Sequence, residues 1–210
     1  MLLSDTFFWN KMARGYAKRP VGNPEAYQIK LDKTAEYLKP TDRMLEFGCG
    51  TGTTALIHAP RVAQVEAIDF SSEMIAIARE KLWDKPADNV SFEVARFEDW
   101  PIPVAGQGYD VILGMSILHL VEDVDATLTK VRKSLKPGGF FFSSTVCLGD
   151  SSGLERFILP PLSAIGILPK LARFKGTELI KRIQDHGFAI EHHWRPSEDA
   201  GIFIVARRVD

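Results

Sequence analysis

Apolar residues along this chain fall into two kinds of pattern. Recurrence every three to four positions predicts amphipathic helices, whereas short apolar runs bounded by turn residues predict buried strands. Helices are expected at residues 23–38, 53–58, 71–82, 124–135 and 177–185. Strands are expected at residues 43–47, 65–69, 90–94, 109–114, 140–145, 188–194 and 202–208. Up to residue 145 the expected strands and helices alternate. This alternation predicts right-handed βαβ units and a parallel sheet within an α/β fold.

Two segments depart from this alternation. Residues 1–40 are expected to form an N-terminal helical lid, in which Pro40 ends the helix at residues 23–38. Residues 148–175 are apolar but interrupted by prolines and glycines, which favours an inserted helical cap over another strand. We therefore expect one domain over residues 1–210. Within it, Pro-Gly-Gly at residues 137–139 should end one helix before the fifth strand begins.

Charge and cysteine content argue against several classes of protein. The chain has 26 Lys and Arg residues and 27 Asp and Glu residues, so its formal net charge is −1, whereas nucleic-acid scaffolds usually carry a basic excess. Cys49 and Cys147 have no close cysteine partner in the sequence. A disulfide framework or a metal site is therefore not expected, and a reducing, cytoplasmic location is. We also expect no signal peptide and no membrane-spanning run of about 18 apolar residues.

The first expected strand runs directly into a glycine-rich loop. The end of the strand and the loop together have the sequence Leu-Glu-Phe-Gly-Cys-Gly-Thr-Gly, at residues 45–52. Glycine allows positive φ and a close approach of the backbone to a ligand, and the next helix offers unpaired N–H groups at its start. Asp69 ends the following strand, where a carboxylate can accept both hydroxyls of a ribose. A dinucleotide fingerprint would need a glycine at position 53, which is Thr53, and no lysine completes a triphosphate-binding loop. The loop therefore predicts a nucleotide-like ligand that is neither NAD nor a nucleoside triphosphate.

Residues 45–52 closely resemble motif I of the class I S-adenosylmethionine (SAM)-dependent methyltransferases. Three later segments resemble further motifs of that family in the same order, at residues 67–74, 109–119 and 135–139. Residues 8–17 resemble the N-terminal segment of its small-molecule members, in the ubiquinone and menaquinone biosynthesis branch. The resemblance implies SAM as the cofactor and a three-layer Rossmann-like fold. Its seven-stranded sheet would be mostly parallel, with an antiparallel last strand.

The resemblance also implies which residues contact the cofactor. They are Glu46, Gly48, Gly50, Asp69, Phe70, Met74, Arg96, Phe97, Met115 and Ser116. Asp69 would bind the ribose hydroxyls, and Glu46 would lie near the methionine amino group or support the loop. Phe70 and Met74 would line the adenine slot. The two residues that follow the fourth strand would lie beside the transferring methyl group.

One position departs from the family pattern. After the third strand the family often has an acidic residue that accepts a hydrogen bond from the adenine amino group, but Arg96 stands there. A guanidinium cannot accept a hydrogen bond. Either Glu98 or Asp99 takes this role, or Arg96 stacks on the adenine and the Phe97 amide contacts its edge. We favour the second arrangement.

Methyl transfer from a sulfonium needs mainly alignment of the acceptor and exclusion of water. A general base helps only where the acceptor must lose a proton. His119, which follows the fourth strand, is the candidate for that role, although a structural histidine near the next helix accounts for it equally well. Tyr16 either closes over the cofactor or packs within the helical lid.

The sequence favours a methyltransferase whose acceptor is a small molecule, with no nucleic-acid or membrane partner. Two alternatives stay open, namely an RNA or protein acceptor and a SAM-binding protein without activity. Residues 114–117 (Gly-Met-Ser-Ile) stand where many amine-directed nucleic-acid methyltransferases have an Asn-Pro-Pro-Tyr type motif, which counts against RNA. A dehydrogenase is disfavoured by Thr53. The apolar residues 159–168 would suit a homodimer interface as well as a lid.

Overall fold

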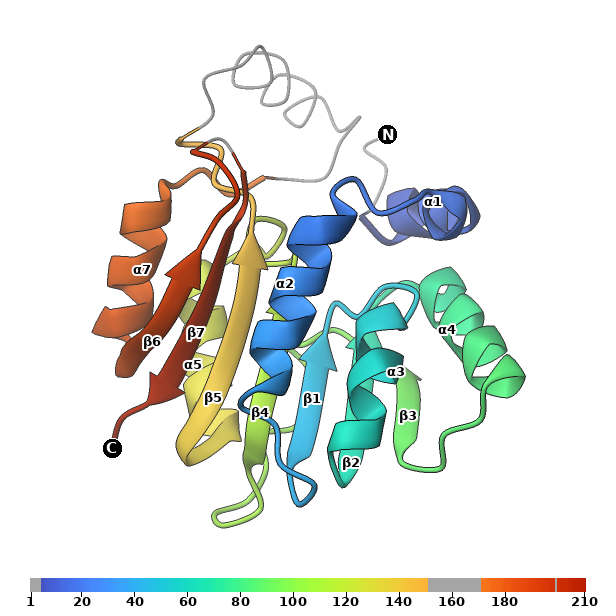
Figure 1. Ribbon diagram of the computed structural model, residues 1–210, viewed down its shortest axis with the longest axis horizontal. Helices are drawn as coiled ribbons and strands as arrows, with labels where there is room; N and C mark the ends of the chain where they lie inside the picture. Colours follow the sequence, from blue (N-terminus) through green and yellow to red (C-terminus); the bar gives the residue numbers. More distant parts are fainter. Residues whose placement is uncertain (1–4, 151–170, 199) are drawn as a thin grey trace.

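A seven-stranded sheet forms the centre of the computed structural model, which describes residues 5–150, 171–198 and 200–210 (Figure 1). The strands are β1 (Arg43–Phe47), β2 (Gln64–Asp69), β3 (Val90–Val94), β4 (Tyr109–Met115), β5 (Leu135–Thr145), β6 (Phe188–Trp194) and β7 (Ile202–Arg208). Their order across the sheet is β3-β2-β1-β4-β5-β7-β6. Only pairs that include β7 are antiparallel among these strands. The mostly parallel Rossmann-like sheet with an antiparallel last strand is therefore confirmed.

Helices cover both faces of the sheet (Figure 1). They are α1 (Asp5–Lys18), α2 (Pro24–Ala35), α3 (Thr53–His58), α4 (Ser72–Asp84), α5 (Val124–Ser134) and α7 (Gly176–Asp185), with a short 3-10 helix η1 (Ala59–Arg61). Alternate residues of each strand supply the two cores: Phe47 packs on the side of α5 and α7, whereas Met44 packs on the side of α3. This alternation is what a strand buried on both faces requires.

The helix expected at residues 23–38 is shorter than predicted. Asn23 caps α2, because its Oδ1 atom accepts a hydrogen bond from the Ala26 amide at 2.9 Å. The helix then ends at Ala35, three residues before the predicted end. The chain tightens there into a turn in which the Leu38 amide donates to the Ala35 carbonyl.

The boundary between α5 and β5 also differs from the prediction, because the helix ends one residue early. Leu135, expected as its last apolar position, already pairs with Tyr109 of β4. The next pair in this ladder joins Phe140 to Val111, so residues 136–139 are accommodated as an irregularity within β5. The Pro-Gly-Gly stretch thus interrupts the strand and does not separate it from the helix.

The N-terminal helix α1 packs against α4, at the edge of the sheet toward which the parallel strands point (Figure 1). Ala13 is fully buried there with Met74 and Ile77. The Oδ1 atom of Asn10 accepts a hydrogen bond from the Ser71 hydroxyl at 2.6 Å, which joins α1 to the cap of α4. The expected helical N-terminal segment is present, and its role as a lid stays a prediction.

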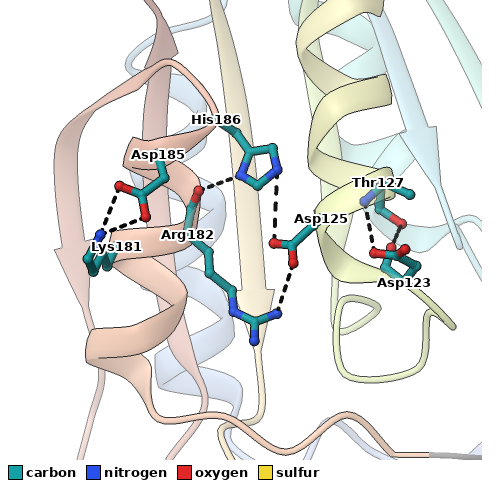
Figure 2. A network of polar contacts seen from close by, with 8 residues as sticks. Asp123, Asp125, Thr127, Lys181, Arg182, Asp185 and His186 are labelled. Atoms are coloured by element: carbon teal, nitrogen blue, oxygen red, sulfur yellow. Dashed lines mark hydrogen bonds and ion pairs between the residues drawn. The ribbon is translucent and has the colours of Figure 1, made fainter.

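Polar contacts join α5 and α7 on one face of the molecule (Figure 2). Asp125 of α5 lies 3.6 Å from an Arg182 guanidinium nitrogen and 3.9 Å from His186 Nε2. The side chains of Asp125 and Arg182 are about half exposed, so their ion pair contributes little to stability.

The cap expected at residues 148–175 lies mostly outside the described residues, and so does the proposed dimer contact at residues 159–168. The two described ends of this segment meet, because the Gly149 amide donates to the Phe174 carbonyl at 3.0 Å. The segment therefore leaves β5 and returns to α7 at nearly the same place.

Candidate active site

The glycine loop turns the chain from β1 into α3. Gly48 and Gly52 have φ values of 64° and 73°, in the left-handed region that favours glycine. A Cβ on Gly48 would lie 2.8 Å from Ile117 Cδ1, and a Cβ on Gly52 would lie 2.6 Å from the Phe92 ring. Both the backbone conformation and the packing therefore require glycine at these two positions.

Asp69, at the end of β2, joins the glycine loop to the start of α4. Its Oδ2 atom accepts a hydrogen bond from the Gly50 amide at 2.9 Å, and its Oδ1 atom accepts one from the Ser71 amide at 2.8 Å. Burial raises the pKa of this carboxyl, although the two amides act in the opposite direction. Each oxygen retains a second lone pair, so the carboxylate can still accept hydrogen bonds from the hydroxyls of a ligand.

A cavity of about 570 Å³ lies at the carboxyl ends of β1, β4 and β5. Six of the predicted site residues line it: Tyr16, Glu46, Gly48, Gly50, Met115 and Ser116. Pro196 and Gly201, from the loop between β6 and β7, line it too. Ser116 has a positive φ of 57°, and its amide donates to the Ser144 carbonyl at the end of β5. The tips of three neighbouring strands are thereby brought to one concave surface.

A smaller cavity, of about 50 Å³, lies beside the first one. Phe70, Arg96 and Phe97 line it, together with Glu98 and Gly48. The Arg96 guanidinium lies 5.0 Å from the centre of the Phe70 ring, close enough for a cation–π contact. Gly48 lines both cavities, so the two adjoin at the glycine loop.

Glu46 is the acidic residue of the larger cavity, and it is only 2% exposed. The Ala55 amide donates to its carboxyl, but Oε2 has no hydrogen-bond partner among the described residues. Burial raises the pKa of Glu46 to about 8, and nearby Asp69 acts in the same direction. The carboxyl is therefore mostly protonated at neutral pH and would ionise when a cation binds beside it.

Three predicted site residues line neither cavity, namely Asp69, Met74 and His119. Met74 is buried beneath α1 with Ala13 and Ile77 and does not line the smaller cavity, so its contact with adenine stays a prediction of the resemblance. His119 also lines neither cavity, and burial lowers its pKa to about 4. Its carbonyl accepts a hydrogen bond from the Ala172 amide at 2.8 Å. The structural alternative for His119 thus fits its position better than a role as a general base.

Sequence reasoning missed several polar residues of the larger cavity. They are Tyr27, Lys30, Thr54, Lys81 and Ser144. The Tyr27 hydroxyl lies 3.1 Å from Thr54 Oγ1, and Lys30 Nζ donates to Ser144 Oγ at 2.9 Å. A lysine three residues after Tyr27 shares its helix face, which was the available signal for Lys30. Lys81 donates to hydroxyls of the glycine loop, a contact that the sequence does not indicate.

Over residues 5–150, 171–198 and 200–210, no group of His, Cys, Asp and Glu side chains is placed to hold a metal ion. Within the same described residues, no helix is both long enough and apolar enough to cross a membrane.

The sequence matches a family model described as a methyltransferase domain over residues 38–195. It is 37% identical over 105 residues to a malonyl-[acyl-carrier protein] O-methyltransferase of Bacillus cytotoxicus, a match that covers 49% of this chain and 35% of the relative. It is 28% identical over 157 residues to a ubiquinone biosynthesis O-methyltransferase of Thiobacillus denitrificans, covering 71% of this chain and 65% of the relative. The chain thus matches less than two thirds of the length of either protein.

Solved structures share the fold at low sequence identity. The structure of a phosphoethanolamine N-methyltransferase 2 from Haemonchus contortus, in complex with phosphomonomethylethanolamine and S-adenosylhomocysteine, superposes with a TM-score of 0.75 at 16% identity. The match covers 99% of this chain and 58% of that one. Because the family model matches most of the sequence, the chain belongs to the methyltransferase-domain family, among the class I SAM-dependent methyltransferases.

Proposed function

We propose that this protein is a SAM-dependent methyltransferase that transfers a methyl group to a small-molecule acceptor. The observation that carries the proposal is the pair of cavities that adjoin at Gly48. The Asp69 carboxylate lines neither cavity itself, but it accepts a hydrogen bond from Gly50 of the larger cavity and is followed in the chain by Phe70 of the smaller one. A ligand with an aromatic base, a ribose and a polar tail fits this order.

The donors and acceptors of the site fit SAM in particular. The unpartnered Glu46 Oε2 atom suits the ammonium of the methionyl part, since a cation beside a buried carboxyl favours its charged form. The free lone pairs of Asp69 suit ribose hydroxyls. Ile117 already fills the space that a Cβ on Gly48 would take, so the backbone of Gly48 itself lines both cavities.

At the adenine end, the Arg96 guanidinium, which lies on the Phe70 ring, would stack on one side of the base, and the Phe97 amide would contact its edge. Glu98 also lines this slot, so it stays an alternative partner for the adenine amino group. Phe97 stacks on Phe47 with ring centres 4.2 Å apart, which fixes the backbone that would make the contact.

When bound, SAM supplies a methyl group on a sulfonium sulfur, which an acceptor can displace in line. The task of this chain is then to align the acceptor and exclude water. Met115 and Ser116 would form the wall beside the transferring methyl group, and Tyr16 would cover the cavity from α1. Because His119 lies outside the cavity, we assign it no proton transfer.

Two observations favour a small acceptor. The larger cavity is lined by α2 and by the loop between β6 and β7, and its volume suits a small molecule beside the cofactor tail. Of the two curated relatives, the one that matches most of this chain is named for ubiquinone biosynthesis, whereas the other is named for malonyl-[acyl-carrier protein], a group carried on a protein. A cytoplasmic location, where SAM is made, suits this role.

The test is turnover of methyl-labelled SAM with panels of small phenols, carboxylic acids and amines, with total RNA as a separate arm. We expect S-adenosylhomocysteine to form at least tenfold above background with one small-molecule class. Turnover with RNA alone would redirect the proposal to a macromolecular acceptor. Binding of the cofactor without turnover in every arm would favour a SAM-binding protein without activity.

A further inference from the structure

Lys30 places an ammonium group in the wall of the larger cavity. Its Nζ atom donates to Ser144 Oγ at 2.9 Å, so the side chain reaches from α2 to the end of β5. None of the ion pairs among the described residues involves Lys30. Burial lowers the pKa of this lysine, and no carboxylate offsets the effect. A half-buried cation without an anionic partner is costly unless a ligand supplies the charge.

The helix that carries Lys30 is held firmly on the sheet. Leu31 is 5% exposed and Thr34 is fully buried, and the Thr34 hydroxyl donates to the Lys30 carbonyl at 2.8 Å. One turn earlier, the Tyr27 hydroxyl contacts Thr54 of α3. These anchors fix the origin of the lysine side chain, so its position at Ser144 does not depend on a mobile loop.

The charge of the cavity favours an anionic ligand. Arg19, Lys30 and Lys81 line it, and all three are cations. The acidic residue among its lining, Glu46, is neutralised by its proton in the empty cavity and would be paired with the cofactor ammonium once SAM binds, so in neither state does it offset these cations. Cavities lined by one sign of charge concentrate ligands of the opposite sign.

Lys30 also lies at the acceptor side of the proposed cofactor site. The small cavity forms around residues that follow β2 and β3, whereas Ser144 belongs to β5. In the sheet order β3-β2-β1-β4-β5, the tips of β1 and β4 separate the two. Lys81, in contrast, donates to Thr51 of the glycine loop and to Thr53 at the start of α3. These contacts place it beside the proposed cofactor site.

We propose that Lys30 and Ser144 bind a carboxylate group of the methyl acceptor, an inference that rests on the proposed function. The ammonium has donors left after its bond to Ser144, and the Ser144 hydroxyl, which accepts from Lys30, keeps its own hydrogen for a ligand oxygen. Together they present two charge-assisted donors to one carboxylate. The acceptor class is therefore a small organic acid.

The test is calorimetric titration of the protein loaded with S-adenosylhomocysteine. The probes are 4-hydroxybenzoate and octanoate, each compared with its neutral amide. We expect the acids to bind the wild-type protein at least tenfold more tightly than their amides. Lys30→Met should reduce this preference to less than twofold, while its affinity for S-adenosylhomocysteine stays within twofold of wild type. Ser144→Ala should reduce the preference partly.

Lys33→Met is the matched control, because Lys33 lies on the same helix but pairs with Glu36 and does not line the cavity. It should keep the preference for acids. Equal binding of acids and amides to the wild-type protein would overturn the proposal. So would a Lys30→Met variant that keeps the preference but loses tenfold in S-adenosylhomocysteine affinity, because the cation would then serve the cofactor. If the wild-type protein does not bind S-adenosylhomocysteine, the proposed function itself fails.

Discussion

Asp69 Oδ2 accepts a hydrogen bond from the Gly50 amide at 2.9 Å. This contact joins the end of β2 to the loop that follows β1, so the carboxylate proposed to bind the ribose also fixes the loop beside it. Its second oxygen is held by Ser71 at the start of α4. The proposed ribose contact and the loop conformation therefore depend on the same side chain.

Asp69→Asn should weaken S-adenosylhomocysteine binding at least tenfold. The amide group would turn its NH2 toward the N–H of either Gly50 or Ser71, where two donors would face each other. Calorimetric titration of the variant measures the loss. Glu73→Gln, a nearby acid that lines neither cavity, should bind like wild type. Unchanged affinity in Asp69→Asn would contradict the assigned role.

Gly48→Ala should destabilise the fold by about 1–3 kcal/mol and abolish cofactor binding, since the new Cβ meets Ile117 and the backbone is left-handed. Urea unfolding measures the stability. Adding Ile117→Ala should recover part of it by removing the clash. Gly15→Ala is the control, because a Cβ there meets nothing within 4 Å and should stabilise α1. Normal stability in Gly48→Ala would contradict the packing argument.

Glu46 should make stability fall as pH rises. Its pKa is about 8 in the folded protein and near the usual 4.5 in the unfolded chain. The unfolded state therefore loses its proton first, and stability declines between about pH 4.5 and pH 8. Glu46→Gln, which cannot ionise, should flatten this part of the profile measured by urea unfolding. A steeper or unchanged slope in the variant would show that the carboxyl is not buried in its neutral form.

His119 should act on stability and not on turnover. Its pKa is about 4 when folded and 6.5 when unfolded, so stability should be lost as pH falls from 6.5 toward 4. His119→Asn should lessen that loss in urea unfolding at pH 5, and the rate of S-adenosylhomocysteine formation should stay within threefold of wild type. His193→Asn, at an exposed strand position, is the control. A rate reduced a hundredfold in His119→Asn would restore the general-base assignment.

The sequence predicts most of the fold because its signals are local. The strand at residues 43–47 and the helix at residues 53–58 appear at the predicted bounds, since a short apolar run followed by glycines specifies both. The start of β5 was placed too late, because its first residue, Leu135, looks like one more helical position. Only the ladder with β4 assigns it to a strand.

The candidate site was predicted where a motif lies on the backbone and missed where a distant helix supplies the side chain. The roles of Gly48 and Asp69 could be predicted from the residues next to them in the sequence, because each directly follows or ends a predicted strand. Lys30 is separated from Ser144 by 114 positions, and only the packing of α2 on the sheet brings them together. Met74 follows its motif correctly but faces α1, which the motif does not encode.

The central claim, that the two cavities adjoining at Gly48 form a SAM site, is tested most directly by titrating the wild-type protein with S-adenosylhomocysteine in a calorimeter. We predict saturable binding at one site per chain, with a dissociation constant below about 100 μM, within the range usual for enzyme ligands. Absence of binding at millimolar ligand, by a protein that is shown to be folded, would contradict the account.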